Sequence, residues 1–91
     1  MFAVVVQEKG DAARVLGGGE HVAANVMPQV KQAPGIVSAT WTTDEDGRTL
    51  NVLVFEDEQA ARMAVDRIRT APRPPFISVE TVEVRQVLAH F

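Results

Sequence analysis

Apolar residues recur along this chain in two kinds of segment. Four short stretches are rich in β-branched and aromatic residues, and the segments after the first and third of these stretches carry apolar residues three and four positions apart. Stretches of the first kind are typical of strands, and a spacing of three and four is typical of amphipathic helices. The pattern therefore predicts the element order β-α-β-β-α-β, as one domain over residues 1–91.

The predicted strands are rich in valine, isoleucine, threonine and aromatic residues. In the last strand the parity of the apolar positions changes near Thr81, which predicts a β-bulge. The sequence DEDG at 44–47 predicts a hairpin with a four-residue loop, in which Gly47 adopts the left-handed conformation. The strands are expected at 2–7, 36–43, 49–55 and 77–91.

The first predicted helix begins at Glu20, after a stretch with charged residues and four glycines at 8–20 that we expect to be a loop. Pro28 lies inside the helical pattern. Because proline lacks an amide donor and crowds the preceding turn, we expect a kink or a break there. The apolar stripe of this helix is formed by Val22, Val26, Val30 and Ala33.

The second predicted helix covers 57–70, with Asp57 as its N-cap. The proline-rich sequence APRPP at 71–75 ends it. Arginines surround this end, and they are candidates for holding a carboxylate. The alternative is that they interact with the helix dipole. These residues are Arg67, Arg69 and Arg73.

The element order matches the ferredoxin-like α+β fold, a four-stranded antiparallel sheet with two helices on one face. Both faces of the predicted sheet are apolar, and the helices can cover only one of them. A chain of this size also buries only about 60 to 65% of its unfolded surface. We therefore expect a homodimer with two-fold symmetry, its sheets packed face to face. In the first strand, one face carries Phe2, Val4 and Val6, and the other carries Ala3 and Val5.

The composition excludes several classes of protein. With 46% hydrophobic residues the chain is expected to be globular, and no apolar run reaches the length of a membrane span. There is no cysteine, and the N-terminus lacks the features of a signal peptide, so we expect a cytoplasmic protein without a disulfide or a metal. The net charge is −3 and the first and third strands are aliphatic, which argues against binding of nucleic acid.

The sequence APGIVSATWTTDEDGRTLNVLVFEDEQAARMAV, residues 33–65, resembles the dimeric α/β-barrel superfamily. Within it, the small antibiotic-biosynthesis-monooxygenase-like proteins are the most similar. The likeness lies in a Pro-Gly before the second strand, a tryptophan within that strand, an acidic turn ending in glycine, and an apolar strand that runs into the second helix. The resemblance implies a homodimeric barrel with a small cavity between sheet and helices. Members use this cavity for cofactor-free oxygenation, haem degradation, lactone isomerisation or no known reaction.

The residues of this chain depart from both of the best-defined activities that the resemblance implies. Haem-degrading members use an asparagine on the first strand, a tryptophan, and a histidine on the second helix. Here the first predicted strand ends in Gln7, and 57–70 contains no histidine. Oxygenases acting on phenolic polyketides place tyrosines in the pocket, and this chain has none. An enzyme and a non-catalytic binding protein therefore both stay open, and no cofactor is expected.

Trp41 is the only tryptophan of the chain. With a four-residue hairpin loop, Thr43 pairs with Arg48 and Trp41 lies opposite Leu50, on an apolar face. This register favours packing in the core or in the dimer interface. A shift of one residue would move the indole to the other face, where it would be the aromatic wall of a ligand site.

That other face mixes polar and apolar residues, and it is the predicted site for a small apolar or aromatic ligand. Buried polar groups there need partners from a subunit, water or a ligand. The alternative is a satisfied polar pair near a strand end. The candidate ligand-binding residues are Ser38, Thr40, Trp41, Asn51 and Phe55.

His21 and Asn25 lie one turn apart on the first predicted helix. Histidine titrates near neutral pH, so this pair is the candidate for proton transfer at the mouth of a cavity. The alternative is a solvated helix face. The sequence thus predicts a small dimeric protein that binds an apolar or aromatic molecule, either as a cofactor-independent monooxygenase or as a non-catalytic ligand-binding or protein-interaction dimer.

Overall fold

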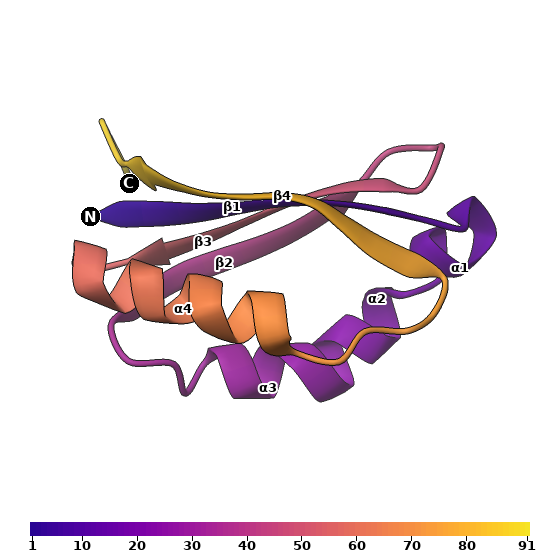
Figure 1. Cartoon of the computed structure of the whole chain (residues 1–91), viewed down its shortest axis with the longest axis horizontal. Helices are drawn as coiled ribbons and strands as arrows, with labels where there is room; N and C mark the ends of the chain where they lie inside the picture. The colour runs from indigo at the N-terminus through magenta and orange to yellow at the C-terminus, as the bar shows by residue number, and fades with distance from the viewer.

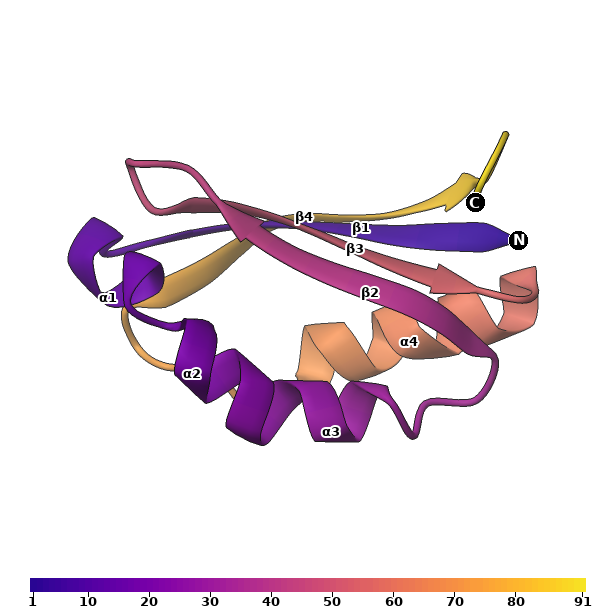
Figure 2. The same cartoon turned by 180° about the vertical axis from the view of Figure 1, so that it is seen from behind.

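The computed structural model describes all 91 residues. Its four strands form one antiparallel sheet in the order β2-β3-β1-β4, and the helices lie on one side of it (Figures 1 and 2). The predicted ferredoxin-like α+β fold is confirmed. The strands are β1 (Phe2–Gly10), β2 (Ile36–Thr43), β3 (Arg48–Phe55) and β4 (Ile77–Gln86).

Helix α4 (Glu58–Thr70) packs its apolar stripe against the sheet. The side chain of Asp57 caps it by accepting a hydrogen bond of 2.8 Å from the amide of Ala60, as the sequence predicts. The residues that α4 buries are Ala60, Ala61, Ala64 and Val65, and they meet Val4, Val6, Leu53 and Phe55 of the sheet.

The helical segment from Gly19 to Val30, called the first helical segment below because it corresponds to the first predicted helix, is continuous but irregular near Pro28. It consists of α2 (Gly19–His21), a π-helical turn η1 (Val22–Val26) and α3 (Met27–Val30). Pro28 lies in the first turn of α3, where its missing amide costs no intrahelical hydrogen bond. No residue between 19 and 30 is buried, so this segment covers the sheet less closely than α4 does.

The prediction of a loop at 8–20 was wrong for most of its length. Strand β1 continues to Gly10, and a short helix α1 (Ala12–Leu16) follows it. Asp11 is the N-cap of this helix, and its carboxylate accepts a hydrogen bond from the amide of Arg14. An N-cap aspartate followed by two alanines was enough to begin a helix among the glycines.

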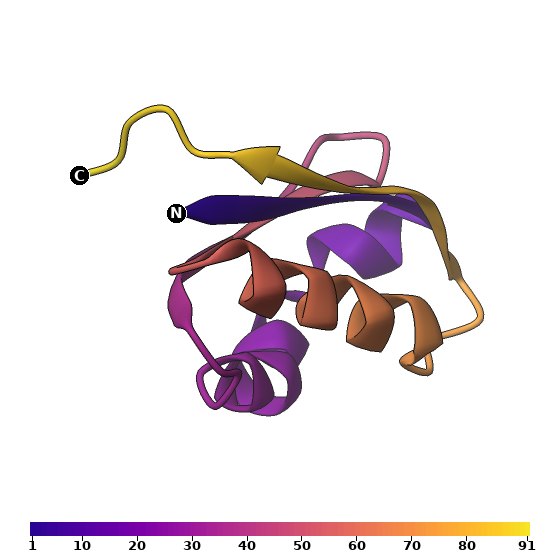
Figure 3. The same cartoon turned by 60° about the vertical axis from the view of Figure 1, so that its left-hand side comes forward.

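The last strand is shorter than predicted. β4 ends at Gln86, and the chain then leaves the sheet (Figure 3). The amide of Val87 still donates to the carbonyl of Met1, the residue before β1. Residues after Val87 extend past the start of β1, so they have no strand to pair with. The predicted bulge is present, because Gln7 pairs with Thr81 and Glu8 with Val79, which leaves Glu80 as the extra residue.

The hairpin between β2 and β3 has a register different from the predicted one. The amide of Asp44 donates to the carbonyl of Arg48 (2.9 Å), so that the loop has three residues, 45–47. Gly47 has a φ of +81° and forms the bulge position of a three-residue hairpin loop. Thr43 therefore pairs with Thr49 and not with Arg48. From Ser38 to Thr43 the residues of β2 therefore change faces relative to the prediction. Ile36 keeps its predicted face with Phe55, because the pairing shifts again between Ile36 and Ser38.

The sheet face away from the helices is apolar at its centre and carries charged and hydroxyl side chains around it. Leu50 there is 43% exposed. The prediction that both faces of the sheet are apolar is confirmed. The apolar residues on this outer face are Ala3, Val5, Leu50, Val52 and Val54. No helix of the chain has the length and apolar character needed to cross a membrane.

Candidate functional site

Trp41 lies on the helix side of the sheet. Ala39, two residues earlier on β2, packs against the core, and residues two apart in a strand share a face. Trp41 pairs with Asn51 of β3, and its side chain is half-buried. The predicted pairing with Leu50 was wrong, and the indole is placed where a ligand site would have an aromatic wall.

Asn51 is the one buried polar residue of the chain. Its side-chain oxygen accepts a hydrogen bond of 3.3 Å from the backbone amide of Thr42, and its Nδ2 donates to Oε1 of Glu8 at 3.0 Å. The oxygen and the nitrogen of the side-chain amide therefore each form a hydrogen bond within the protein. These bonds hold the side chain in one orientation beside Trp41.

Glu8 collects three donors on the helix side of the sheet. It follows Val4 and Val6 on the same face of β1, at the end of the apolar row. Besides Asn51, the hydroxyl of Thr49 donates to Oε1 at 3.4 Å, and Nε of Arg73 donates to Oε2 at 3.1 Å. Residues from β1, β3 and the proline-containing loop after α4 thus form one polar cluster, which consists of Glu8, Thr49, Asn51 and Arg73.

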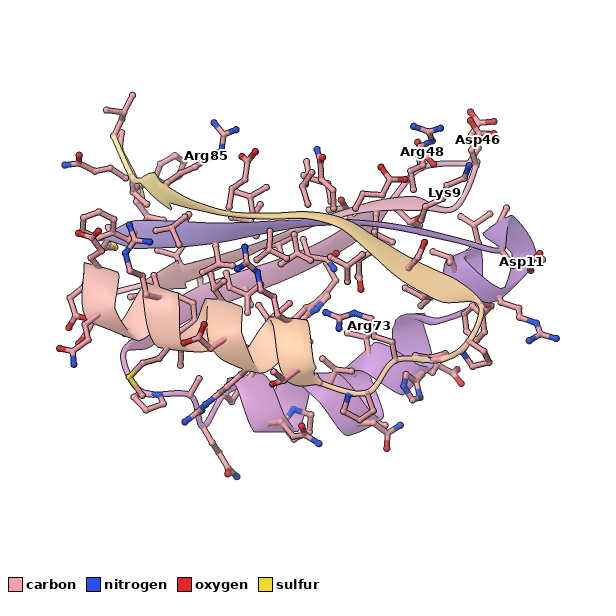
Figure 4. The ribbon with its side chains drawn as sticks, in the orientation of Figure 1. Lys9, Asp11, Asp46, Arg48, Arg73 and Arg85 are labelled. Carbon is pink, nitrogen blue, oxygen red and sulfur yellow. The ribbon has the colours of Figure 1, made fainter.

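The ion pair in this cluster is largely shielded from water. The side chain of Glu8 is 15% exposed and that of Arg73 is 21% exposed. Arg73 also donates to the carbonyl of Ala71 through Nη1 (3.2 Å), which fixes the guanidinium. Figure 4 shows Arg73 on the helix side of the sheet. The two charges cancel within the cluster.

The polar cluster borders a hollow of about 370 Å³ at the hairpin end of the molecule. Glu8 and Thr49 line it together with residues such as Thr43, Asp44 and Arg48. Gln7 and Leu50 of the outer face line it as well, whereas Trp41 and Asn51 do not.

Two solved structures are similar to this chain over almost its full length. One is a monooxygenase, ActVA-Orf6 of Streptomyces coelicolor, in complex with the ligand nanaomycin D; it has 22% identity and a TM-score of 0.65, and the match covers 99% of this chain and 89% of that one. The other is the heme-degrader MhuD from Mycobacterium tuberculosis with two hemes bound; it has 12% identity and a TM-score of 0.72, and the match covers 100% and 99%.

The chain shares the fold of these two proteins. This is the fold that the resemblance of residues 33–65 implies. No protein-family model matches the sequence, and no curated protein matches it at a significant level.

Within this fold, three of the predicted ligand-binding residues lie away from the polar cluster. Ser38 and Thr40 pair with Val54 and Val52 on the outer face, because of the corrected register. Ser38 there has its Oγ 3.5 Å from Nε2 of His90, in the C-terminal tail. Phe55 is 1% exposed and fills the core. Only Trp41 and Asn51 of the predicted set come together.

His21 and Asn25 contact each other at the start of the first helical segment. Nδ2 of Asn25 lies 3.2 Å from Nδ1 of His21 and also donates to the carbonyl of His21 at 3.3 Å. Both residues are exposed, and neither is hydrogen-bonded to a residue of the polar cluster. The predicted spacing of one turn is confirmed.

Sequence reasoning missed Glu8 and underestimated Arg73. Glu8 was assigned to a loop because a glycine and several charged residues follow it. The signal that identifies it is the alternation Val4, Val6, Glu8, which places the carboxylate on the core side of the strand. Arg73 was considered as a carboxylate partner, and the structure provides that carboxylate from 65 residues away in the sequence.

Proposed function

We propose that this protein binds a small apolar or aromatic molecule on the helix side of its sheet. Trp41 forms the aromatic wall of the site, and Asn51 lies at its polar end. The observation that carries the proposal is the pairing of a half-buried indole with a buried amide on the side of the sheet that faces the helices. Buried aromatic and polar groups in this combination are typical of small-molecule sites.

Two further observations support the proposal. The first helical segment buries none of its residues, so the apolar surface on this side is incompletely covered. In addition, the two similar structures hold nanaomycin D and heme, which are both small ring-containing ligands.

The proposal includes a two-fold homodimer formed through the outer sheet faces. Val5 and Val52 are only half-buried there, and Leu50 is exposed. A second copy would cover these side chains with the same apolar surface.

The chemical role has two forms. In the enzymatic form, the protein is a cofactor-independent monooxygenase in which the bound aromatic molecule reacts with dioxygen, and His21 with Asn25 is the candidate catalytic pair. In the alternative form, the dimer binds its ligand without turnover. The fold of a monooxygenase favours the first form, and the solvent-exposed position of the pair favours the second.

The proposal is tested by NMR, because a single tryptophan gives a single indole N–H resonance. We expect aromatic compounds, naphthylmethanol first, to shift the Trp41 resonance in a saturable way when they are titrated into the nitrogen-labelled protein. Asn51→Ala should weaken the binding several-fold, since it removes a polar anchor.

The matched control is Thr40→Ala, which changes a side chain on the outer face and should leave the affinity unchanged. If no member of an aromatic panel shifts the Trp41 resonance, the proposed site is wrong.

A further inference from the structure

Glu8 is a shielded carboxylate that the proposed ligand site has not yet used. It lies at the end of an apolar row on β1, 15% exposed, with donors from three other residues. A carboxylate in such a position is costly to desolvate, and its partners only partly offset that cost. Stability of the fold therefore does not by itself account for a carboxylate at this position.

The charges around Glu8 balance within the polar cluster. Arg73 is the only cation that forms a hydrogen bond or an ion pair with it. Three other cations, Lys9, Arg48 and Arg85, lie on the opposite side of the sheet in Figure 4. A molecule beside Trp41 would meet an arginine whose charge is already neutralised.

We propose that Glu8 determines the charge specificity of the site by neutralising Arg73, so that the site accepts uncharged small molecules and rejects carboxylates. This inference rests on the proposed ligand site at Trp41. Asn51 connects the two, because it pairs with Trp41 in the sheet and donates to Glu8 at 3.0 Å.

The rejection of anions follows from desolvation and repulsion. An anionic ligand would lose its water without gaining an unpaired positive charge. It would also lie near the carboxylate of Glu8 in a region of reduced dielectric constant, where like charges repel more strongly than in water. An uncharged ligand with a hydroxyl group avoids both costs, and the free lone pairs of Glu8 can accept its hydrogen bond.

The test compares three probes of similar size and different charge, which are naphthylmethanol, naphthoate and naphthylmethylamine, all substituted at the same ring carbon. Affinities are measured from the shift of the Trp41 indole resonance at neutral pH. For the unmodified protein we expect naphthylmethanol to bind about tenfold more tightly than naphthoate. For Glu8→Gln we expect the affinity for naphthoate to rise about tenfold, with little change for naphthylmethanol, because Arg73 is then unpaired.

The control for the change in net charge is Glu56→Gln. Glu56 is exposed and follows β3 at the end of the sheet away from the hairpin. This variant loses the same negative charge and should keep the affinities of the unmodified protein for all three probes.

A second variant keeps the inference testable if Glu8→Gln fails to fold. Arg73→Gln leaves Glu8 without its cation, so the affinity for the cationic amine should rise several-fold and that for naphthoate should fall further. A purely structural role of the ion pair would weaken all three probes together.

The outcomes separate the two proposals. Equal affinities for naphthylmethanol and naphthoate, or a naphthoate affinity that neither variant changes, would overturn the role of Glu8 and leave the site at Trp41 intact. A Trp41 resonance that no probe shifts would overturn the site itself, and the charge specificity with it.

Discussion

Gly47 determines the register of the β2–β3 hairpin, and with it the sheet face on which larger side chains such as Trp41 lie. Its φ is +81°, and a Cβ atom at this position would lie 2.6 Å from the carbonyl oxygen of Gly10. The same two residues are also hydrogen-bonded, since the amide of Gly10 donates to the carbonyl of Gly47 at 3.0 Å. The glycine thus sets the hairpin register and brings Trp41 opposite Asn51.

Gly47→Ala should destabilise the protein for two reasons, the left-handed backbone and the clash with Gly10. We expect a loss of about 1–3 kcal/mol in the free energy of unfolding, measured by chemical denaturation. Gly19→Ala is the matched control, because a Cβ at Gly19 meets nothing within 4 Å and alanine favours a helix. Equal stability of the two variants would contradict this account of the turn.

At the scale of elements, the two helical segments differ in how they are held. α4 has an N-cap and four buried residues, so its position is defined by packing. The segment from Gly19 to Val30 has a π turn before Pro28 and no buried residue. Such π turns are frequent at functional sites, and this one contains Asn25 and begins directly after His21.

The proposed catalytic role of this segment can be tested on both residues together. The variant His21→Ala/Asn25→Ala should reduce dioxygen uptake with any aromatic substrate to the background rate, if the pair transfers protons. Its thermal unfolding should match that of the unmodified protein, because both side chains are exposed. Unchanged dioxygen uptake would remove the pair from the mechanism.

At the scale of the whole molecule, helices pack against one face of the sheet, and the other face is apolar and has no element packed against it. Strands β1 and β3 occupy the centre of the sheet and contribute the apolar residues of that outer face. Contiguous apolar surface of this kind is typical of an interface. It supports the proposed dimer.

Leu50→Glu should convert the dimer to a monomer, because it places a charge on the apolar surface of the proposed interface. Met63→Glu is the matched control. Met63 is as exposed as Leu50, 43% in each case, but lies on α4. Native mass spectrometry or sedimentation should find a monomer for the first variant and a dimer for the second. A monomeric mass of the unmodified protein at micromolar concentration would refute the dimer.

Much of the fold was predictable because it depends on local chemistry. The N-cap at Asp57, the irregular helix at Pro28 and the bulge near Thr81 each follow from one residue type or from a change of parity within one strand. The faces of β1 were also correct, since alternation within a strand needs no knowledge of its neighbours. These features determined the element order, and with it the ferredoxin-like fold.

The candidate site depended on relations between elements. The hairpin loop has three residues instead of the predicted four, and this shift of one residue places Trp41 on the helix side and Ser38 and Thr40 on the outer face. The pattern of apolar residues does not specify the length of the loop. The contact between Glu8 and Arg73 joins positions 65 residues apart, and it exists only because β1 and the loop after α4 meet in the folded chain. Local propensity determined the elements of this protein, and the packing of those elements decided which side chains form the site.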